Sequence, residues 1–204
     1  MAGAGGRTCG IGKENRGSIE LSMAERISKQ RTKRQARRWQ RKVEQFRERQ
    51  RQIEASATDI LNSRNFRRTK GYIQHGNMTV NAHVMNVARY SIALSENLHI
   101  PCNRRELIRG ALLHDYFLYD WHIKEPFRKA HGFSHAAVAL QNAERDFQLN
   151  AVERDMIVKH MFPLNLTPPR YRESILVCIA DKICAVYETF SIPIPKNVLQ
   201  VGQI

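Results

Sequence analysis

The chain has 204 residues, of which 42% are apolar, so it is long enough for one domain of ordinary size and an appendage. It contains no run of eighteen apolar residues and starts without a long apolar stretch, so we expect neither a membrane span nor a secretory signal. Four cysteines (Cys9, Cys102, Cys178 and Cys184) form no Cys-x-x-Cys pair. This spacing argues against a zinc knuckle or a disulfide scaffold and predicts a reducing, cytoplasmic location.

The formal net charge of +14 is concentrated in the first third of the chain. Residues 1–70 hold 19 Lys and Arg against 7 Asp and Glu, whereas residues 71–204 hold 14 against 12. The sequence therefore predicts two parts: a basic, partly disordered extension over residues 1–57 and a nearly neutral globular domain over residues 58–204.

Residues 1–18 are rich in glycine and are expected to form a disordered tail. Residues 19–57 lack Pro and Gly and are dominated by Arg, Gln, Glu and Lys, which favours one long helix. Trp39, Val43 and Phe46 share a thin apolar stripe on it. Such an arm could dock on the domain, make a weak contact with nucleic acid or an anionic membrane, or remain solvated without a ligand.

The rest of the chain predicts an all-α fold of about five to seven helices without internal repeats. Alternating strand patterns with turn dipeptides are absent. Asn103, Ser134 and Asn150 are expected to cap helices, and Glu106 and Glu153 stand at the capping-box positions after two of them. The helices are expected over residues 57–65, 79–97, 103–114, 134–147, 150–160 and 171–190.

Histidines and aspartates on three of these helices form a candidate site. His114-Asp115 ends an apolar helix, His83 lies on the apolar face of the helix before it, and Asp181 lies inside an apolar run. Each histidine alone could be an ordinary core residue, and Asp181 could pair with Lys182 or Arg172. A buried carboxylate needs a partner or a metal, however, and helical bundles build metal sites from inward-facing side chains.

The order His83, His114-Asp115, Asp181 resembles the HD-domain superfamily of metal-dependent phosphohydrolases. The resemblance runs from about Thr58 to Pro195, and the His-Asp doublet and Ala180-Asp181-Lys182 are its most diagnostic pieces. Further segments resemble a bacterial subgroup whose substrates are poorly defined: residues 114–121, 131–135 and 160–164. The basic arm has no counterpart in this pattern.

The resemblance implies an HD-type helical bundle that binds divalent metal ions, and two per chain are expected. The ligand types suit Mn, Fe, Co, Ni or Zn. With two metals per chain, His135 and His160 would bind the second one and Asp115 would bridge the pair. With one metal, His135 and His160 would contact the substrate phosphate instead. The metal ligands implied by the resemblance are His83, His114, Asp115, His135, His160 and Asp181.

Other residues are candidates for contact with the substrate. Asp115 and Lys182 are the catalytic candidates, and His75 is expected near the mouth of the pocket. Asp120 could orient a ligand histidine. Lys182 could instead be an ordinary surface lysine. The aromatic side chains after the doublet, including Trp121, could form core or stack on a base. The substrate-binding candidates between the doublet and His135 are Lys124, Arg128, Lys129 and His131.

The function implied is hydrolysis of a phosphomonoester or phosphodiester bond in a small phosphorylated, nucleotide-like substrate, with hydroxide generated at the metal. One alternative is a mixed-valence di-iron oxygenase, since some HD-fold proteins use a similar ligand set that way. A second alternative is a nucleic-acid-binding protein with a basic arm and a vestigial HD core. The oligomeric state is left open by the sequence.

Overall fold

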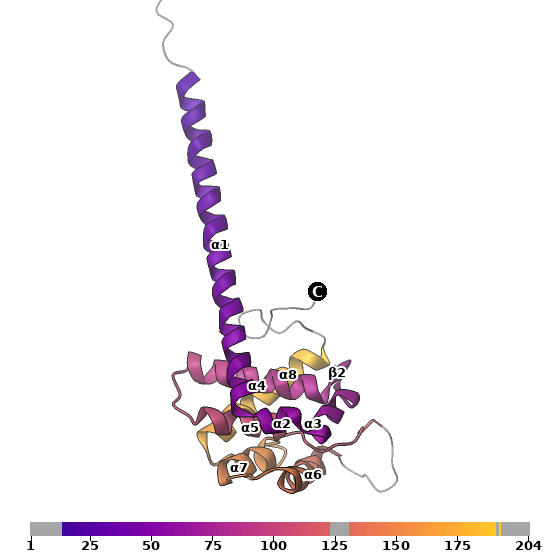
Figure 1. The fold of residues 1–204 in the computed structure, drawn as a ribbon. Coiled ribbons are helices and arrows are strands. Elements are labelled where there is room, and N and C mark those ends of the chain that lie inside the picture. Colours follow the sequence, from indigo (N-terminus) through magenta and orange to yellow (C-terminus); the bar gives the residue numbers. More distant parts are fainter. Residues whose placement is uncertain (1–13, 123–130, 191, 193–204) are drawn as a thin grey trace, which may run out of the picture. The chain divides into compact units, whose positions relative to one another are not determined.

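The computed structural model describes residues 14–122, 131–190 and 192. The chain divides into two compact units, Met1–Lys42 and Val43–Ile204. Helix α1 (Glu14–Ser56) runs through the end of the first unit into the second (Figure 1). The predicted long helix is therefore confirmed, and the expected disordered tail is wrong for residues 14–18, which are helical. The domain boundary after residue 57 stays a prediction, and it differs from the division between these units.

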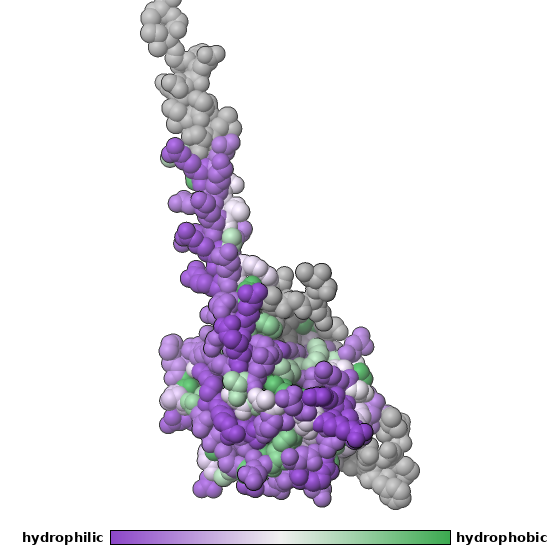
Figure 2. Space-filling view, viewed as in Figure 1, coloured by the Kyte–Doolittle hydropathy of each residue, from purple (hydrophilic) through white to green (hydrophobic). Residues whose placement is uncertain are grey.

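In the first unit, the described part of α1 offers no apolar face for packing. Residues 25–41 are all exposed, including the large apolar side chains of Ile27 and Trp39. Figure 2 shows this stretch as almost uniformly hydrophilic. Residues 26–41 contain eight Lys and Arg and no Asp or Glu. Charge, rather than apolar burial, therefore characterises this segment.

The second unit is an all-α bundle, as the sequence predicted, with one small hairpin (Figure 1). The α-helices that follow α1 in its described part number seven, which agrees with the expected range. The predicted helices over 79–97, 150–160 and 171–190 are confirmed to within one residue at each end. The helices are α2 (Thr58–Asn62), α3 (Arg64–Arg68), α4 (Val80–Asn97), α5 (Arg104–Leu113), α6 (His131–Asp146), α7 (Ala151–Lys159) and α8 (Arg172–Thr189).

Two helix boundaries differ from the predictions. The helix expected over residues 57–65 is divided at Ser63, whose extended backbone ends α2 and whose hydroxyl accepts from the backbone N–H of Phe66 in α3. A Ser side chain competes for backbone hydrogen bonds, which favours a cap over continuation of the helix. Helix α6 begins at His131, so Ser134 lies within it and the prediction that Ser134 caps it is wrong.

The two predicted capping boxes had different outcomes. Asn150 and Glu153 form the reciprocal pair at the start of α7, as expected. Asn103 caps α5 by accepting from Glu106 N–H, but the backbone N–H of Asn103 donates to Glu173 at 2.8 Å. The α5 box is therefore incomplete, because a carboxylate from α8 takes the place of the local one.

The core lies where α4 packs against α5 and α8, with α7 closing the bundle against α5, α6 and α8. Gly110 lets α5 approach α7 closely, since a Cβ at this position would lie 2.5 Å from Met156 Sδ. The last turns of α1 belong to this unit and bury Ile53, while Arg49 forms an ion pair with Glu96 of α4 at 2.9 Å. The C-terminal end of the basic helix therefore packs on the domain, which is one of the three possibilities that the sequence left open.

A two-stranded antiparallel hairpin, which the sequence analysis missed, precedes α4. It consists of β1 (Ile73–His75) and β2 (Met78–Thr79), follows a 3₁₀ turn (Thr69–Gly71), and is too short to show an alternating pattern. Its turn contains Gly76 at φ +54°, where a Cβ would lie 3.3 Å from the carbonyl oxygen of Glu188. The hairpin therefore packs tightly against the end of α8. Among the described helices, none combines the length and apolarity that crossing a bilayer requires.

Candidate metal centre

Six buried histidines and aspartates from five helices converge in the centre of the bundle. His83 lies on α4, His135 on α6 and Asp181 on α8, while His114, Asp115 and His160 directly follow α5 and α7. All are at most 8% exposed. The packing of α4 against α5 and α8, and of α7 against α5, α6 and α8, therefore brings the six side chains together.

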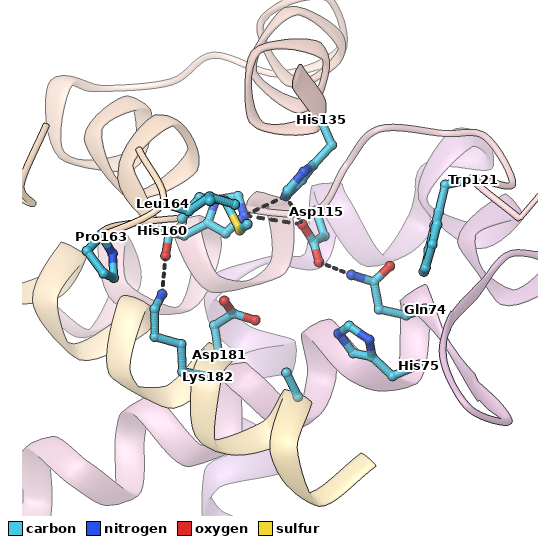
Figure 3. Close-up of a pocket in the computed structure, with 12 residues that line it drawn as sticks. Gln74, His75, Asp115, Trp121, His135, His160, Pro163, Leu164, Asp181 and Lys182 are labelled. Carbon is cyan, nitrogen blue, oxygen red and sulfur yellow. Dashed lines mark hydrogen bonds and ion pairs between the residues drawn. The ribbon is translucent and has the colours of Figure 1, made fainter. Parts of the chain in front are cut away.

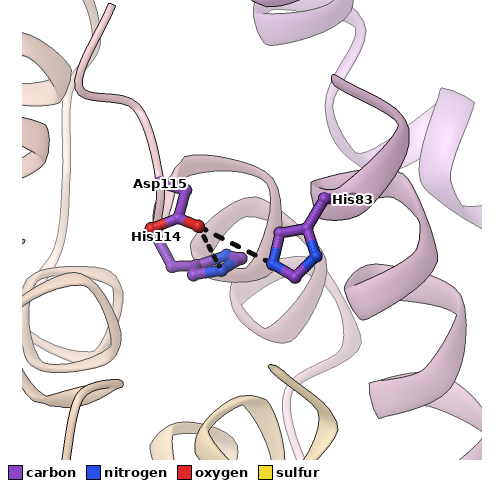
Figure 4. A group of neighbouring side chains, drawn as sticks. All are labelled: His83, His114 and Asp115. Carbon is purple, nitrogen blue, oxygen red and sulfur yellow. Dashed lines mark ion pairs between the residues drawn. The ribbon is translucent and has the colours of Figure 1, made fainter. Parts of the chain in front are cut away.

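The first half of the cluster joins α4 to the end of α5 (Figure 4). Nε2 of His83 lies 3.6 Å from Oδ2 of Asp115, and Nε2 of His114 lies 3.4 Å from the same oxygen. Oδ1 of Asp181 lies 3.2 Å from His83 Nε2 and 3.6 Å from His114 Nε2. His83, His114 and Asp115 form one group whose ligand atoms could hold a metal ion.

The second half of the cluster is built on the other oxygen of Asp115. Oδ1 lies 3.4 Å from Nε2 of His135 and 3.4 Å from Nε2 of His160. The two imidazole nitrogens lie 2.9 Å apart. Asp115, His135 and His160 form a second group that could hold a metal ion. The two oxygens of Asp115 therefore face different histidine pairs.

Hydrogen bonds at Nδ1 turn the Nε2 atoms toward the cluster. His114 Nδ1 lies 2.8 Å from the carbonyl oxygen of Ala111, and His160 Nδ1 lies 2.7 Å from that of Ile157. A carbonyl only accepts, so Nδ1 carries the proton in both rings. Metal-binding histidines are usually oriented in this way by a partner at the other ring nitrogen.

His83 is oriented by a carboxylate from α8. Its Nδ1 lies 2.7 Å from Oε2 of Glu188, which is 7% exposed, and Oε1 of Glu188 accepts from Asn86 at 3.1 Å. Burial of a carboxylate is costly unless its oxygens are satisfied, and here both have partners. The arrangement is that of a carboxylate–histidine pair beside a metal.

Unsatisfied polar atoms at the centre of the cluster fit a cation. Among the described residues, His114 Nε2 and Asp115 Oδ1 are buried without a hydrogen-bond partner. Leaving such an atom unpaired costs about 1–3 kcal/mol, so native proteins rarely retain one without a ligand. Imidazole and carboxylate donors together suit Mn, Fe, Co, Ni and Zn. Asp181 faces the histidines, so the alternative pairing with Lys182 or Arg172 is wrong.

The charges of the cluster shift the pKa values of its members. Burial would lower the pKa of His83, but its hydrogen bonds to Asp181 and Glu188 raise it to about 9. Burial, together with the neighbouring histidines His114 and His135, lowers the pKa of His160 to about 4. Burial would raise the pKa of Asp115, but the surrounding histidines hold it below its usual range. Both aspartates are therefore ionised, since His114 and His83 likewise lower the pKa of Asp181.

A cavity of about 660 Å³ opens onto the cluster (Figure 3). Its volume lies in the range of small-molecule sites. Asp115, His135, His160 and Asp181 line its floor, and His75 lines it too, in agreement with its expected place near the pocket mouth. The remaining lining residues are Gln74, Trp121, Met161, Pro163, Leu164, Lys182 and Ala185.

Lys182 lines this cavity, but its ammonium is engaged with the chain. Nζ donates to the carbonyl oxygen of His160 at 2.7 Å and lies 3.3 Å from Sγ of Cys178. In this arrangement it supports the segment that carries His160. The sequence allowed the aromatic side chains after the doublet to form core or to stack on a base. Trp121 lines the cavity, whereas Tyr116 and Phe117 are buried in the core.

Three of the four predicted substrate-binding residues, Lys124, Arg128 and Lys129, lie outside the described residues. The backbone of His131 begins α6, and its side chain likewise lies outside the described part. The prediction that Asp120 orients a ligand histidine is wrong, because its carboxylate pairs with His122 at 3.1 Å.

Sequence reasoning missed two residues that contact the cluster, Glu188 and Gln74. Glu188 follows Asp181 by seven residues, which is two helical turns, so both lie on one face of α8; this spacing could have indicated it. Gln74 donates from Nε2 to Oδ2 of Asp115 at 2.6 Å. No comparable sequence signal existed for Gln74, since it belongs to the missed hairpin.

Comparison with known proteins agrees with this arrangement. The family model described as HD domain matches residues 80–186, which contain all six residues of the cluster. Neither a curated protein nor a solved structure matches the chain. The matched region covers more than half of the chain and runs from the start of α4 into α8. The chain belongs to the HD domain family.

Proposed function

We propose that this protein is a binuclear, metal-dependent phosphohydrolase that cleaves phosphomonoester or phosphodiester bonds of a small, nucleotide-like substrate. The first metal would be held by His83, His114, Asp115 and Asp181. The second would be held by His135 and His160, with Asp115 shared. Mn, Fe, Co, Ni and Zn are the candidate ions.

The observation that carries this proposal is the position of Asp115 between two histidine pairs. Its Oδ2 faces His83 and His114, and its Oδ1 faces His135 and His160, at 3.4–3.6 Å in every case. A carboxylate shared in this way is the usual means by which two metal ions are held as a pair. With only one metal ion, one of the two histidine pairs beside Asp115 would have no metal to bind.

Divalent metal ions bound here would supply Lewis-acid activation of water and of the phosphate. The chain's own residues provide the surroundings for that chemistry. The apolar side chains of Trp121, Met161 and Leu164 line the cavity and limit access of bulk water to it. Among the described residues that line the cavity, Lys182 carries a positive charge, and we assign it to neutralising the charge of the substrate phosphate. Further candidates for this role are Lys124, Arg128, Lys129 and His131.

Metal analysis of the purified protein, followed by hydrolysis assays, tests the proposal. We expect close to two metal ions per chain in the wild type, and the loss of about one of them in either His83→Ala or His160→Ala. His99→Asn is the matched control, because His99 is exposed at φ 53°, a conformation that Asn tolerates. Hydrolysis of a panel of nucleotides and phosphoesters with Mn²⁺ should require both sites; it is followed as release of inorganic phosphate from monoesters and of the phosphomonoester product from diesters.

Three results would contradict this function. A chain that takes up no metal on soaking overturns both the binuclear and the mononuclear site. About one metal per chain in the wild type, lost in His83→Ala and retained in His160→Ala, argues for a single site. Oxygen uptake by an iron-loaded protein, without hydrolysis of any member of the panel, assigns the centre to the oxygenase alternative.

The exposed cations of α1 favour a second, additional function: a sequence-independent contact with the backbone of duplex DNA. Eight Lys and Arg with no acid occupy residues 26–41, which extend for about 24 Å of helix. These residues are all exposed and provide no continuous apolar face, so insertion into a membrane surface is disfavoured. An α-helix of ordinary diameter fits the major groove, between two rows of phosphates.

Fluorescence anisotropy with the full chain and a labelled DNA duplex tests this contact. Arg31, Arg34 and Arg38 share one helical face, and replacing all three with Gln should weaken binding at least tenfold. The salt dependence should also become shallower, since fewer counterions are released. Arg64, Arg67 and Lys70, which are exposed in the second unit, provide a matched triple control. Equal losses in both triple variants, or binding only to anionic vesicles, would refute the DNA contact.

A further inference from the structure

Gln74 occupies an irregular position in the hairpin that faces the cluster. Ile73 pairs with Thr79 and His75 pairs with Met78, so two residues of β1 advance against one of β2, and Gln74 is the extra residue. Such a β-bulge changes the direction of the side chain it carries and is frequent beside active sites. Gln74 is 6% exposed, whereas Ile73 and His75 on either side are only partly buried. The bulge therefore directs an amide side chain into the interior.

The chemistry of Asp115 determines which end of this amide faces which way. The amide nitrogen Nε2 lies 2.6 Å from Oδ2 of Asp115. A carboxylate oxygen only accepts hydrogen bonds, so the group facing it must be the donating NH₂. The oxygen Oε1 must then point away from Asp115, and Figure 3 shows it on the side where Trp121 lines the cavity.

Within the described part of the chain, Oε1 of Gln74 is buried and has no hydrogen-bond partner. An amide oxygen is an acceptor with two lone pairs and cannot donate. Folded proteins avoid burying an acceptor without a donor, and exceptions usually call for a functional explanation. Because Gln74 lines the cavity, that donor can come from a bound molecule.

We propose that Gln74 is a specificity-determining residue that accepts a hydrogen bond from a hydroxyl group of the substrate. The inference rests on the proposed phosphohydrolase function and narrows its substrate class. Because Nε2 of this amide contacts Asp115, the bound hydroxyl lies close to the phosphate held at the cluster. We therefore assign the substrate to phosphate esters that carry a free hydroxyl near the ester oxygen, and a hydroxyl on the carbon next to the ester carbon is the case tested below.

This assignment predicts a selectivity that apolar walls could not provide. A pocket lined by Trp121, Leu164 and Met161 discriminates weakly between a hydroxyl and a hydrogen atom. A buried acceptor discriminates strongly, because the analogue without the hydroxyl leaves the acceptor unpaired. Among the described residues that line the cavity, Asp115 and Gln74 carry such an unpaired acceptor, and since Asp115 is assigned to the metals, Gln74 Oε1 is the one that meets this requirement.

The test uses two probes that differ by one hydroxyl: adenosine 3′-monophosphate and 2′-deoxyadenosine 3′-monophosphate. Binding to the manganese-loaded full chain is measured by calorimetry, and phosphate release is measured in parallel. We expect the wild type to prefer the ribose compound by at least about tenfold in Kd or kcat/KM. Gln74→Met should reduce the preference to within about twofold, whatever its absolute activity, because it removes the acceptor but retains the side-chain length.

Gln141 is an exposed glutamine on α6, so Gln141→Met should keep the full preference and serves as the matched control. Gln74→Ala provides the same readout if the methionine variant does not fold. A wild type that binds neither probe, or both equally, overturns the proposal. So does a Gln74 variant that retains the preference or weakens both probes in the same ratio, since Gln74 would then act only through Asp115.

Failure of the phosphohydrolase function gives a different result. In that case the wild type releases phosphate from neither probe, while calorimetry still reports whether the ribose compound is preferred. A binding preference that depends on Gln74 without hydrolysis supports the hydroxyl contact and rejects the reaction. Hydrolysis without a preference supports the reaction and rejects the hydroxyl contact.

Discussion

His83 and Glu188 form a buried pair that joins the start of α4 to the end of α8, with Nδ1 of the imidazole 2.7 Å from Oε2 of the carboxylate. The carboxylate fixes the ring so that Nε2 points at Asp181 and Asp115. It also raises the electron density of the ring, which strengthens Nε2 as a metal ligand. Glu188 therefore influences the proposed metal site without contacting the metal.

Replacing Glu188 with Gln should weaken metal binding while leaving the six ligands in place. The amide retains a hydrogen-bonding group but loses the charge that orients and polarises His83, so we expect about 10–100-fold lower affinity for one metal per chain. Calorimetric titration of the metal-free protein with Mn²⁺ measures the change. Glu144→Gln, at a partly exposed ion pair with Arg154, is the control and should bind metal like the wild type. Equal affinity in both variants would show that Glu188 has only a structural role.

Metal affinity should increase with pH over the neutral and mildly alkaline range. In the metal-free protein, the pKa of His83 is raised from its ordinary value of 6.5 to about 9, and the pKa of His114 is raised by its aspartate neighbours, against the effect of burial. A metal must displace these protons before it can bind to the imidazoles. Calorimetry at several pH values, in buffers of different ionisation enthalpy, should detect proton release on binding. A pH-independent Kd without proton release would contradict the shifted pKa values.

The same shift predicts how the stability of the metal-free protein changes with pH. Because the pKa of His83 is higher in the folded state, protonation stabilises the fold fully below about pH 6.5, and this contribution is lost as the pH rises through about 9. Urea unfolding in the presence of a chelator should therefore show decreasing stability between these values. His83→Gln should flatten this dependence, because Gln does not titrate in this range. A wild-type curve that increases over the same interval would refute this prediction.

The sequence predicted the parts of the fold that depend on local patterns. The apolar periodicity of α4 placed His83 on its inward face, and the apolar run around Asp181 indicated a buried carboxylate in α8. The box of Asn150 and Glu153 indicated the start of α7. These features depend on residues within a few turns of one another. The order of ligands along the chain then indicated the family, which the match over residues 80–186 confirms.

The parts that could not be predicted depend on how separate elements meet. Glu173 replaces Glu106 at the start of α5 because the packing of α8 brings its carboxylate to Asn103 N–H. The contact between Gln74 and Asp115 joins residues 41 positions apart through a bulge in a three-residue strand. A sequence period cannot encode such contacts, since neither partner shows a local pattern that identifies the other.

The buried ion pair of Arg109 and Glu153 between α5 and α7 should contribute to the free energy of unfolding. Arg109 is 2% exposed and donates to Glu153 at 2.8 Å and to Asp59 at 2.7 Å, joining α5 to α7 and α2. Arg109→Met should destabilise the fold by about 3–5 kcal/mol, because it leaves the buried charge of Glu153 without its partner. The double variant Arg109→Met/Glu153→Gln should recover part of this loss. Urea unfolding measures both, and a loss below about 1 kcal/mol would refute the prediction.

Gly110 should resist substitution, although a glycine inside a helix normally weakens it. Alanine would favour α5 by about 1 kcal/mol in isolation. At this position, however, its Cβ would lie 2.5 Å from Sδ and 3.1 Å from Cβ of Met156, so this fully buried side chain would have to move or α5 and α7 would have to separate. Overpacking of this kind costs about 1–3 kcal/mol, so we expect Gly110→Ala to be destabilising on balance. It should also weaken metal binding, since α5 and α7 carry His114 and His160 at their ends. In a Met156→Ala background the same substitution should cost less, because Sδ and Cε of Met156 are gone and only the contact with Cβ at 3.1 Å remains. Urea unfolding measures both backgrounds, and equal destabilisation in the two would show that the contact with Met156 is not what requires glycine.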